Sequence, residues 1–572
     1  MKLRNHLLTG FLSLVIVACS PESAPPATTA PAPAADDAAL QAAIAIPDPY
    51  AADIAEDILR HGGNAVDAAI ATGLAMAVTY IDAGNIGGGG FMLIHLEGET
   101  AFLDYREKAP LAADRDMYLD ENGEVIENAS LIGGQAVAVP GTVAGFWAAH
   151  QRFGSLPWPD LVAPAIRLAA EGFLPAEILV NDIRNSYDWF GDATNFRQYF
   201  GDISTDKPFR QPELAATLTR IAERGAQDFY AGETAELIVR QMAKSNGLIT
   251  RDDLHQYTAK WRQPLKAKWR DFELLSAPPP SSGGFAVVQL LKMKDFLDHE
   301  FEGVAHNSPQ YIHLVAEMEK RVFADRAEYM GDPDFVDVDV TALIADDYVS
   351  RRALEVDPEN ISTLEGVKPG RESPDTTHYS IVDQWGNAVS NTYTINWNYG
   401  SGIVVEGAGF LLNNEMDDFS AKPGVPNIFG VVGNTANEIQ PGKRPLSSMS
   451  PTILVENGRA RMVVGTPGGS TIFTSVFQTI VNIVDFGMSP TDAVAATRFH
   501  HQLLPPDLIT MSVTRPLPES TISALGDRGY RVEPHEWEFG DVQVIWHDGE
   551  NYLPAADPRD RGVGRVIEIS EP

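Results

Sequence analysis

Two stretches rich in β-branched and aromatic residues follow one another closely in the second half of the chain. Residues 377–382 have the sequence THYSIV and residues 388–396 have the sequence AVSNTYTIN, with the glycine-containing segment 384–386 between them. Two such runs around a short loop predict a β-hairpin. Residues 357–375, which precede the hairpin, show no apolar periodicity and contain several prolines and glycines. This composition predicts a linker that ends where the first strand begins.

The register of this hairpin brings two threonines together. If Asp383 pairs with Asn387 across the turn, Thr376 lies opposite Thr394, and directly opposed side chains in such a pair are roughly 5 Å apart. Asn396 follows two residues later, and the alternation of a strand turns its side chain to the same face. A threonine that begins a strand directly after a linker is placed where a self-cleaving hydrolase holds its nucleophile.

Helical and strand patterns alternate along the rest of the chain. Capping residues, glycines and apolar periodicity predict helices at residues 51–60, from Asn64 to about Tyr80, and from Ser308-Pro309 onward. Residues 461–464 predict a buried strand, and residues 471–486 an apolar helix. Helices between strand runs predict a layered α/β architecture.

Scission of the bond between Asp375 and Thr376 would supply the Thr376 hydroxyl with a base. A threonine hydroxyl is a weak nucleophile unless a base adjoins it, and an N-terminal amine serves as one. Such an amine has a pKa of about 7.7–8.0 in peptides, so much of it is neutral near physiological pH. The alternative is that Thr376 and Thr394 form an ordinary cross-strand pair, which strand composition alone favours.

The segment between the predicted strand and the apolar helix is rich in glycine. Residues 465–470 have the sequence GTPGGS, and a glycine-rich turn at a helix start presents backbone N–H groups to a negative charge. In acyl transfer such donors stabilise the oxyanion. The alternative is a tight turn that needs glycine only for its backbone angles, and the residues by themselves favour that alternative.

Seven segments, taken in order, resemble the γ-glutamyltranspeptidase family. Those resembling its small subunit are 376–380 (TTHYS), 411–420 (LLNNEMDDFS), 443–452 (KRPLSSMSPT) and 465–470 (GTPGGS). Those resembling its large subunit are 62–69 (GGNAVDAA), 104–107 (DYRE) and 324–326 (ADR). The likeness runs from about residue 40 to the C-terminus. No single motif is decisive, whereas the ordered set is highly specific.

The resemblance implies a four-layer αββα sandwich of the N-terminal-nucleophile hydrolase type. Two autoprocessed subunits, residues 38–375 and 376–572, would form it together as a heterodimer. The implied activity is cleavage of the γ-glutamyl bond of glutathione and related compounds through an acyl-enzyme on Thr376. Water, amino acids or peptides would then accept the γ-glutamyl group. No metal or cofactor is implied by either step.

The resemblance also implies a role for each matched residue. Thr394 orients the nucleophile Thr376, and Gly468 and Gly469 form the oxyanion hole. The substrate-binding residues divide between the two charged groups of a free α-amino acid: Arg106, Ser447 and Ser448 for the carboxylate, and Asn396, Glu415 and Asp418 for the ammonium. Glu415 occupies a position where relatives carry Gln or Glu, so we expect a more acidic ammonium pocket here.

Two alternatives remain open from the sequence. One is an acylase of the same superfamily that acts on glutaryl side chains, as cephalosporin acylases do. A glutaryl group has no ammonium, so Asn396, Glu415 and Asp418 argue against it. The other is a non-catalytic lipoprotein that binds amino acids in the same pocket.

Several motifs are set aside or left uncertain. The glycine run 87–90 lacks the spacing of a dinucleotide-binding fingerprint. Relatives usually carry Ser-Gly before this run, so Gly84-Asn85 leaves the loop conformation uncertain. His500-His501 lacks helical metal-ligand spacing, which favours a structural role over zinc, and His378 is not assigned as the base. Residues 422–433 predict a mobile loop in which Phe429 replaces the gating tyrosine of some relatives.

The N-terminus predicts export. Residues 1–19 begin with Lys2 and Arg4, continue with a short apolar run and end in IVAC, which resembles a bacterial lipoprotein signal with lipidation at Cys19. Cys19 is the only cysteine of the chain. Residues 20–37, rich in Pro and Ala, predict a tether. The alternative is ordinary secretion with cleavage near residues 32–34.

Composition agrees with an exported enzyme. A chain of 572 residues with 44% hydrophobic side chains can bury a large core. The formal net charge of −35 argues against nucleic acid as a partner. We therefore expect a protein of the bacterial periplasm that contacts the membrane only through its lipid anchor.

Overall fold

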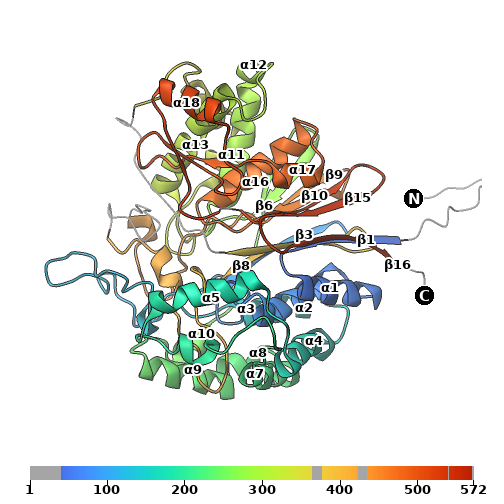
Figure 1. The fold of residues 1–572 in the computed structure, drawn as a ribbon, viewed down its shortest axis with the longest axis vertical. Helices are drawn as coiled ribbons and strands as arrows, with labels where there is room; N and C mark the ends of the chain where they lie inside the picture. Colours follow the sequence, from blue (N-terminus) through green and yellow to red (C-terminus); the bar gives the residue numbers. More distant parts are fainter. Residues whose placement is uncertain (1–39, 364–375, 423–434, 539, 570–572) are drawn as a thin grey trace, which may run out of the picture. The chain divides into compact units, whose positions relative to one another are not determined.

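The computed structural model describes residues 40–363, 376–422, 435–538 and 540–569. The described residues form two stacked sheets with helices on both outer faces, so the layers run helix, sheet, sheet, helix (Figure 1). This confirms the predicted αββα sandwich. None of the helices in the described ranges combines the length and the apolar character needed to cross a membrane.

The first sheet has seven strands in the order β16-β1-β7-β8-β2-β3-β4. Their bounds are β16 Val563–Ile569, β1 Leu40–Ile46, β7 Thr377–Val382, β8 Ala388–Thr394, β2 Gly89–Leu96, β3 Glu99–Asp104 and β4 Lys260–Arg262. All its neighbouring strands run antiparallel. The hairpin β7–β8 therefore lies in the middle of the sheet, with a partner strand on each side.

The second sheet has six strands in the order β15-β14-β10-β9-β6-β5, and a three-stranded sheet β11-β12-β13 accompanies it. The six are β15 Tyr552–Ala556, β14 Gln543–His547, β10 Arg459–Gly465, β9 Thr452–Glu456, β6 Phe272–Ser276 and β5 Leu265–Trp269. The three are β11 Phe499–His500, β12 Leu508–Met511 and β13 Arg531–Pro534. Each of the two large sheets combines strands from before and after residue 375, so neither part of the chain forms a large sheet of its own.

In the described part of the chain, the helices between residues 49 and 256 cover the outer face of the first sheet and extend away from it (Figure 1). They are α1 Pro49–Arg60, α2 Ala65–Thr79, α3 Thr142–Phe153, α4 Trp158–Glu171, α5 Glu177–Phe190, α6 Phe196–Phe200, α7 Pro212–Arg224, α8 Ala226–Ala231, α9 Glu233–Lys244 and α10 Arg251–Gln256. The predicted capping by Asn64 is confirmed, because its side chain accepts hydrogen bonds from the backbone N–H groups of Val66 and Asp67.

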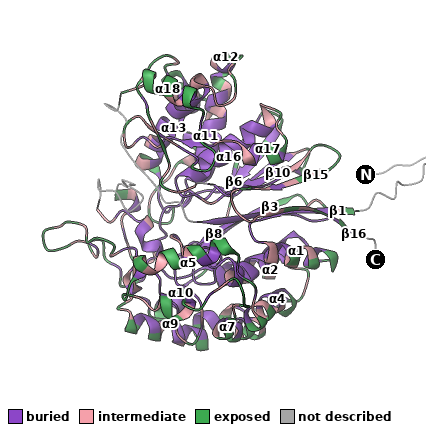
Figure 2. Cartoon of the chain, viewed as in Figure 1, coloured by how far each residue is buried: buried purple, intermediate pink, exposed green. Residues whose placement is uncertain are grey.

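The remaining helices lie on the side of the second sheet (Figure 1). They are α11 Gly283–Phe296, α12 Asp298–Phe301, α13 Pro309–Tyr329, α14 Val340–Leu343, α15 Asp346–Leu354, α16 Thr471–Val484, α17 Pro490–Ala495 and α18 Glu519–Arg528. Ser308 caps the long helix α13 as predicted. The buried residues concentrate between the layers (Figure 2), and one apolar cluster, which includes Phe91, Leu275 and Val463, fills the space between the two sheets.

The predicted hairpin register is confirmed. Asp383 donates its backbone N–H to the carbonyl of Asn387 at 3.0 Å, and Thr377 faces Tyr393 at the other end of the ladder. Thr376 is the residue directly before this last pair, and Thr394 is its counterpart on β8. Strand β8 ends at Thr394, two residues earlier than the run of β-branched residues suggested.

Candidate active site

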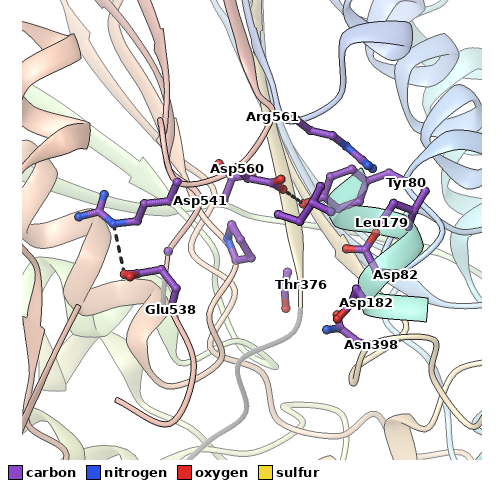
Figure 3. A pocket seen from close by; sticks show the side chains of 14 residues that line it. Tyr80, Asp82, Leu179, Asp182, Thr376, Asn398, Glu538, Asp541, Asp560 and Arg561 are labelled. Atoms are coloured by element: carbon purple, nitrogen blue, oxygen red, sulfur yellow. Dashed lines mark hydrogen bonds and ion pairs between the residues drawn. The ribbon is translucent and has the colours of Figure 1, made fainter. Parts of the chain in front are cut away.

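Thr376 directly precedes β7 and lies between two cavities. It is 8% exposed, and it lines both a small cavity on one side and a larger one on the other. Figure 3 shows it beside the larger cavity. A hydroxyl in this place can react with a molecule held in one cavity while the other receives what leaves.

The small cavity gathers nine of the residues singled out from the sequence. Besides Met449 and Ile472, its lining consists of Arg106, Thr376, Thr394, Asn396, Glu415, Asp418, Ser447, Ser448 and Gly469. Gly468 belongs to the same turn but does not line it. The free space is about 20 Å³, roughly the room of one water molecule, because the side chains around Arg106 contact one another across it.

Arg106 is the centre of this cavity. Its side chain is 1% exposed, and its two terminal nitrogens donate hydrogen bonds to the carboxylates of Glu415 and Asp418. Its Nη2 also donates to the carbonyl of Leu446 at 3.1 Å. A buried guanidinium needs such partners, since an unpaired buried charge is very costly. Burial raises the pKa of Asp418, and the neighbouring Arg106 opposes that rise.

The backbone around Arg106 is held from several sides. Arg106 follows β3, and its N–H donates to Asp104 Oδ1 at 3.0 Å. The hydroxyl of Tyr257 donates to the carbonyl of Arg106 at 2.8 Å. Asp104 in turn pairs with Arg262 and Arg444. These contacts fix the DYRE segment, so the guanidinium is aimed before any ligand arrives.

A short 3-10 helix, Glu415–Asp418, places the two carboxylates that face Arg106. Asn413 accepts the N–H of Glu415 at 3.0 Å and donates to the carbonyls of Gly87 and Ala138. Asn414 accepts the N–H of Trp397 at 3.0 Å and donates to the carbonyl of Leu131. The two asparagines of the LLNNEMDD segment thus tie the helix to the rest of the site.

Asn396 reaches the cavity by a route that strand alternation did not predict. Its φ is +75°, a left-handed conformation that asparagine tolerates better than most residues. Its N–H donates to Thr394 Oγ1 at 2.8 Å, and its side-chain amide donates to the carbonyl of Asn414 at 3.1 Å. The residue was placed correctly beside Thr394, but a turn rather than a continuing strand brings it there.

Asn85 is a residue of the site that sequence reasoning missed. Its amide donates to the carbonyl of Thr394 at 2.9 Å, and its Oδ1 accepts from the N–H of Gly88 and the hydroxyl of Thr142. The segment Gly84-Asn85, whose conformation the sequence left uncertain, is therefore held in a defined conformation. The available signal was a polar side chain two residues before a glycine run.

Ser448 offers an unused hydroxyl to the cavity. It is buried, and within the described part of the chain its Oγ has no hydrogen-bond partner. Ser447 Oγ accepts the N–H of Met449 at 3.1 Å, and its carbonyl accepts the N–H of Ser282 at 2.7 Å. The adjacent serines therefore differ, one holding the loop and the other free to bind a ligand.

The glycine-rich turn after β10 needs its glycines for the backbone and also faces Thr376. Gly468 has a φ of +128° and Gly469 a φ of +55°. Their carbonyls accept from the first N–H groups of α16, those of Thr471 and Ile472. The positive φ values bear out the backbone-angle interpretation. Gly469 also lines the small cavity together with Thr376, and the oxyanion-hole role of this turn stays a prediction.

His378 shares a face with Thr376 but has a structural role. It is fully buried, where its ring nitrogens contact the hydroxyls of Thr392 and Ser380 at 2.8 and 3.0 Å. Burial lowers its pKa to about 3, so the ring stays neutral at physiological pH. A Cβ on Gly465 would lie 2.3 Å from this ring, which explains the glycine that ends β10.

His500 and His501 also bond within the protein. His500 contacts Thr474 Oγ1 and Gln502 Oε1, and His501 contacts the carbonyl of Leu508. Burial lowers the pKa of His501 to about 4. Three predicted positions, Cys19, Asp375 and Phe429, and the predicted mobile loop beyond residue 422 lie outside the described residues.

The larger cavity has a volume of about 270 Å³ and an acidic lining. Asp82, Asp182, Asp541 and Asp560 lie around it together with Arg561 (Figure 3). Asp560 accepts a hydrogen bond from Tyr80 at 2.7 Å. Burial raises the pKa of Asp82 to about 7, against the effect of Arg561. This space is large enough for a small amine or dipeptide beside Thr376.

The fold and this arrangement around Thr376 define an acyltransferring hydrolase of the N-terminal-nucleophile type. The profile of the family described as Gamma-glutamyltranspeptidase matches residues 51–567. The chain belongs to the γ-glutamyltranspeptidase family.

Sequence relatives and solved structures agree with this assignment. The glutathione hydrolase proenzyme of Pseudomonas aeruginosa is 55% identical over 92% of this chain and 94% of its own. That of Escherichia coli is 44% identical over 91% of each chain. The γ-glutamyltranspeptidase of Pseudomonas nitroreducens complexed with L-DON is 53% identical, with a TM-score of 0.56 over 56% of this chain and 96% of that chain. A cephalosporin acylase of Bacillus halodurans is 26% identical, with a TM-score of 0.78 over 92% and 96%.

Gly468→Ala is expected to damage catalysis more than a comparable change elsewhere. An added Cβ would lie 2.3 Å from Thr471 Oγ1, which would displace the turn beside Thr376. Loss of one oxyanion donor lowers turnover by about 10²–10³-fold, measurable with a chromogenic γ-glutamyl anilide. Gly458→Ala is the control, because Gly458 also has a positive φ but nothing lies within 4 Å of its added Cβ. Equal turnover by the two variants would contradict the role of the turn.

Proposed function

We propose that the chain is a self-processing γ-glutamyl hydrolase and transpeptidase that cleaves glutathione and related γ-glutamyl compounds. The observation that carries this proposal is the small cavity, where Thr376 adjoins a buried arginine and two carboxylates. Such a site matches the free α-amino acid end of a γ-glutamyl group. The names of the relatives, glutathione hydrolase proenzymes, support it.

Maturation follows from the position of Thr376. Its hydroxyl attacks the carbonyl of Asp375, the peptide nitrogen becomes the free amine of Thr376, and water hydrolyses the resulting ester. The products are a fragment that ends at Asp375 and contains the large subunit, residues 38–375, and a fragment of residues 376–572. Because each large sheet contains strands of both parts, the two fragments stay associated. The solved Pseudomonas nitroreducens chain, which matches 56% of this one along 96% of its own length, supports such a division.

In the mature enzyme the amine of Thr376 accepts the proton of its own hydroxyl, which attacks the γ-carbonyl of the donor. Backbone N–H groups of the 468–469 turn stabilise the oxyanion. The donor's amide nitrogen takes up the proton and departs as an amine, leaving a γ-glutamyl ester on Thr376. Water or the amine of an amino acid or peptide then attacks this ester and releases the γ-glutamyl group.

Recognition of the donor uses contacts that the protein makes with itself when empty. Arg106 exchanges part of its pairing with Glu415 and Asp418 for the donor's α-carboxylate, to which Ser448 donates a further hydrogen bond. The donor's ammonium takes the place that Arg106 gives up, between Glu415, Asp418 and Asn396. The larger cavity on the other side of Thr376 receives the departing amine and the acceptor.

A glutaryl acylase is the second candidate, favoured by the likeness to a cephalosporin acylase. A glutaryl donor lacks the ammonium, so it would leave the carboxylates of Glu415 and Asp418 without a cationic ligand. Buried charges without a partner are strongly disfavoured, and this argues for the γ-glutamyl donor.

We expect kcat/KM for γ-glutamyl-p-nitroanilide to exceed that for glutaryl-p-nitroanilide by about 100-fold, since a hydrogen bond to a charged group contributes about 1.5–3 kcal/mol. Asp418→Asn should weaken the γ-glutamyl reaction and leave any glutaryl reaction almost unchanged. A preference of the wild type for the glutaryl anilide would refute the proposed donor.

A denaturing gel tests the self-processing. The wild type should give two fragments and Thr376→Ala a single chain, because alanine has no hydroxyl to attack the Asp375 carbonyl. Thr377→Ala is the matched control: Thr377 is the buried neighbour, and its variant should still divide. An undivided wild-type chain that nevertheless turns over the γ-glutamyl anilide would sink the mechanism, and an undivided, inactive one would support the binding-protein alternative.

We also propose that Cys19 is lipidated and anchors the enzyme to a membrane facing the bacterial periplasm. The proposal rests on the signal-like sequence before Cys19 and the Pro/Ala-rich tether after it. Wild-type protein expressed with its signal should sediment with membranes, and Cys19→Ser should appear in the aqueous periplasmic fraction. Mass spectrometry of the N-terminal peptide checks for the lipid directly; an unmodified Cys19, or a mature chain that begins near residue 35, would contradict the anchor.

A further inference from the structure

Glu107 is a buried carboxyl group that the proposed mechanism leaves unused. It follows Arg106 and is fully buried, and among the described residues no group donates a hydrogen bond to either of its side-chain oxygens. Its Oε2 lies 3.7 Å from Arg106 Nη1. A carboxylate in such a place is costly unless it is paired or protonated.

The group that Glu107 faces is another carboxyl group. Glu107 and Glu415 both lie at Nη1 of Arg106, and their side chains are within hydrogen-bonding reach of one another. Glu415 Oε1 accepts the hydrogen bond of Arg106, whereas its Oε2 is buried and also has no donor within the described ranges. Two carboxylates in contact repel one another, and sharing one proton removes the repulsion and supplies the missing hydrogen bond.

One glycine of the run 87–90 packs against Glu107. A Cβ on Gly89 would lie 2.6 Å from Glu107 Oε2 and 2.6 Å from the carbonyl of Tyr105. Glu107 therefore occupies the space that any side chain at position 89 would need. This contact gives a physical reason for one glycine of the run 87–90 that the sequence left unexplained.

The surrounding charges balance with one proton on the pair. The ionisable groups that interact with Glu107 are Arg106, Asp418, Glu415, Tyr105, Tyr230 and Tyr257. Burial raises the pKa of all three tyrosines, so they are neutral. Arg326 interacts with Asp418 from α13. Arg106 and Arg326 then offset Asp418 and a single negative charge shared by Glu107 and Glu415.

We propose that Glu107 is a positioning residue that shares one proton with Glu415, and that this proton keeps Arg106 available for the donor's α-carboxylate. The inference rests on the proposed function and adds to it a residue and a pH dependence of donor binding. In this proposal the proton joins a side-chain oxygen of Glu107 to Glu415 Oε2, the oxygen of Glu415 that does not accept from Arg106.

The direction of the pH dependence follows from the raised pKa of Glu107. Burial raises the pKa of Glu107 to about 7, although Arg106 opposes the rise. Burial also raises the pKa of Glu415, so the pair holds its proton at pH 7 and below and loses it as the pH rises further. Without the proton, Glu107 becomes a second anion at Arg106 Nη1 and competes with the donor's carboxylate. KM for the donor should rise with pH while kcat is little affected.

Two single variants test this without changing the charge of the site. Glu415→Gln and Glu107→Gln each replace the shared proton by an amide N–H that donates to the remaining carboxylate. Between pH 6 and pH 9, KM of the wild type for γ-glutamyl-p-nitroanilide should rise, and this rise should exceed that of either variant by about fivefold or more. The loss of one proton can change KM by at most about tenfold per pH unit.

The controls separate this role from a general effect on the fold. Glu107→Gln/Glu415→Gln removes the shared negative charge and should raise KM at every pH. Glu319→Gln changes another buried glutamate whose pKa is raised by burial, outside the site, and should keep the wild-type profile. If KM of Glu415→Gln rises with pH as KM of the wild type does, the shared proton is refuted.

Calorimetry of L-glutamate binding gives an independent readout. In buffers of different ionisation enthalpy at pH 8, the wild type should take up a fraction of a proton on binding, and Glu415→Gln clearly less. Equal proton uptake by the two proteins would overturn the inference even where a variant turns over poorly. A wild type that binds L-glutamate with the predicted uptake but cleaves no γ-glutamyl anilide would instead refute the proposed function and retain the proton pair.

Discussion

The pairing of β7 with β8 at the centre of the first sheet is the constraint on which the site depends. Strand β1 pairs with β7 and strand β2 with β8, so neighbours on both sides fix the register. A shift by one residue would turn every side chain of the hairpin to the opposite face. The same register that sets Thr376 at the cavities buries His378 and Ser380 between the sheets, where both bond to the protein.

Burying Arg106 imposes the second constraint. A guanidinium that is almost fully removed from water must have anionic partners, and the protein supplies them from a segment about 310 residues further along the chain. Replacing such buried pairs by apolar residues is often neutral or stabilising, so the cluster is better explained by binding than by stability. The cavity holds a positive guanidinium and negative carboxylates side by side. The α-carbon of an amino acid likewise carries a positive ammonium and a negative carboxylate.

The two sides of Thr376 differ in their electrostatics. In the small cavity positive and negative side chains pair with one another, whereas the larger cavity has an excess of carboxyl groups. Two of these are Asp82 and Asp182, and burial raises the pKa of each. The glycine-rich turn lies between them, with Pro467 on one side and Gly469 on the other. This arrangement gives the reacting carbonyl one enclosed, charge-paired side and one roomier side from which an amine can depart or enter.

The sequence by itself determined the elements whose causes lie within a few residues. The hairpin with its register, the Asn64 cap, the start of α13 and the strand–turn–helix around Gly468 all follow from local periodicity and capping. The tertiary structure alone decided that Asn85 holds Thr394, that a left-handed turn carries Asn396 into the cavity, and that Glu107 faces Glu415. Family motifs named Arg106 and Glu415 separately, but no local pattern shows that they touch. Contacts between distant segments depend on how the sheets and loops pack together, and in this protein that packing brings the charged groups into one buried space.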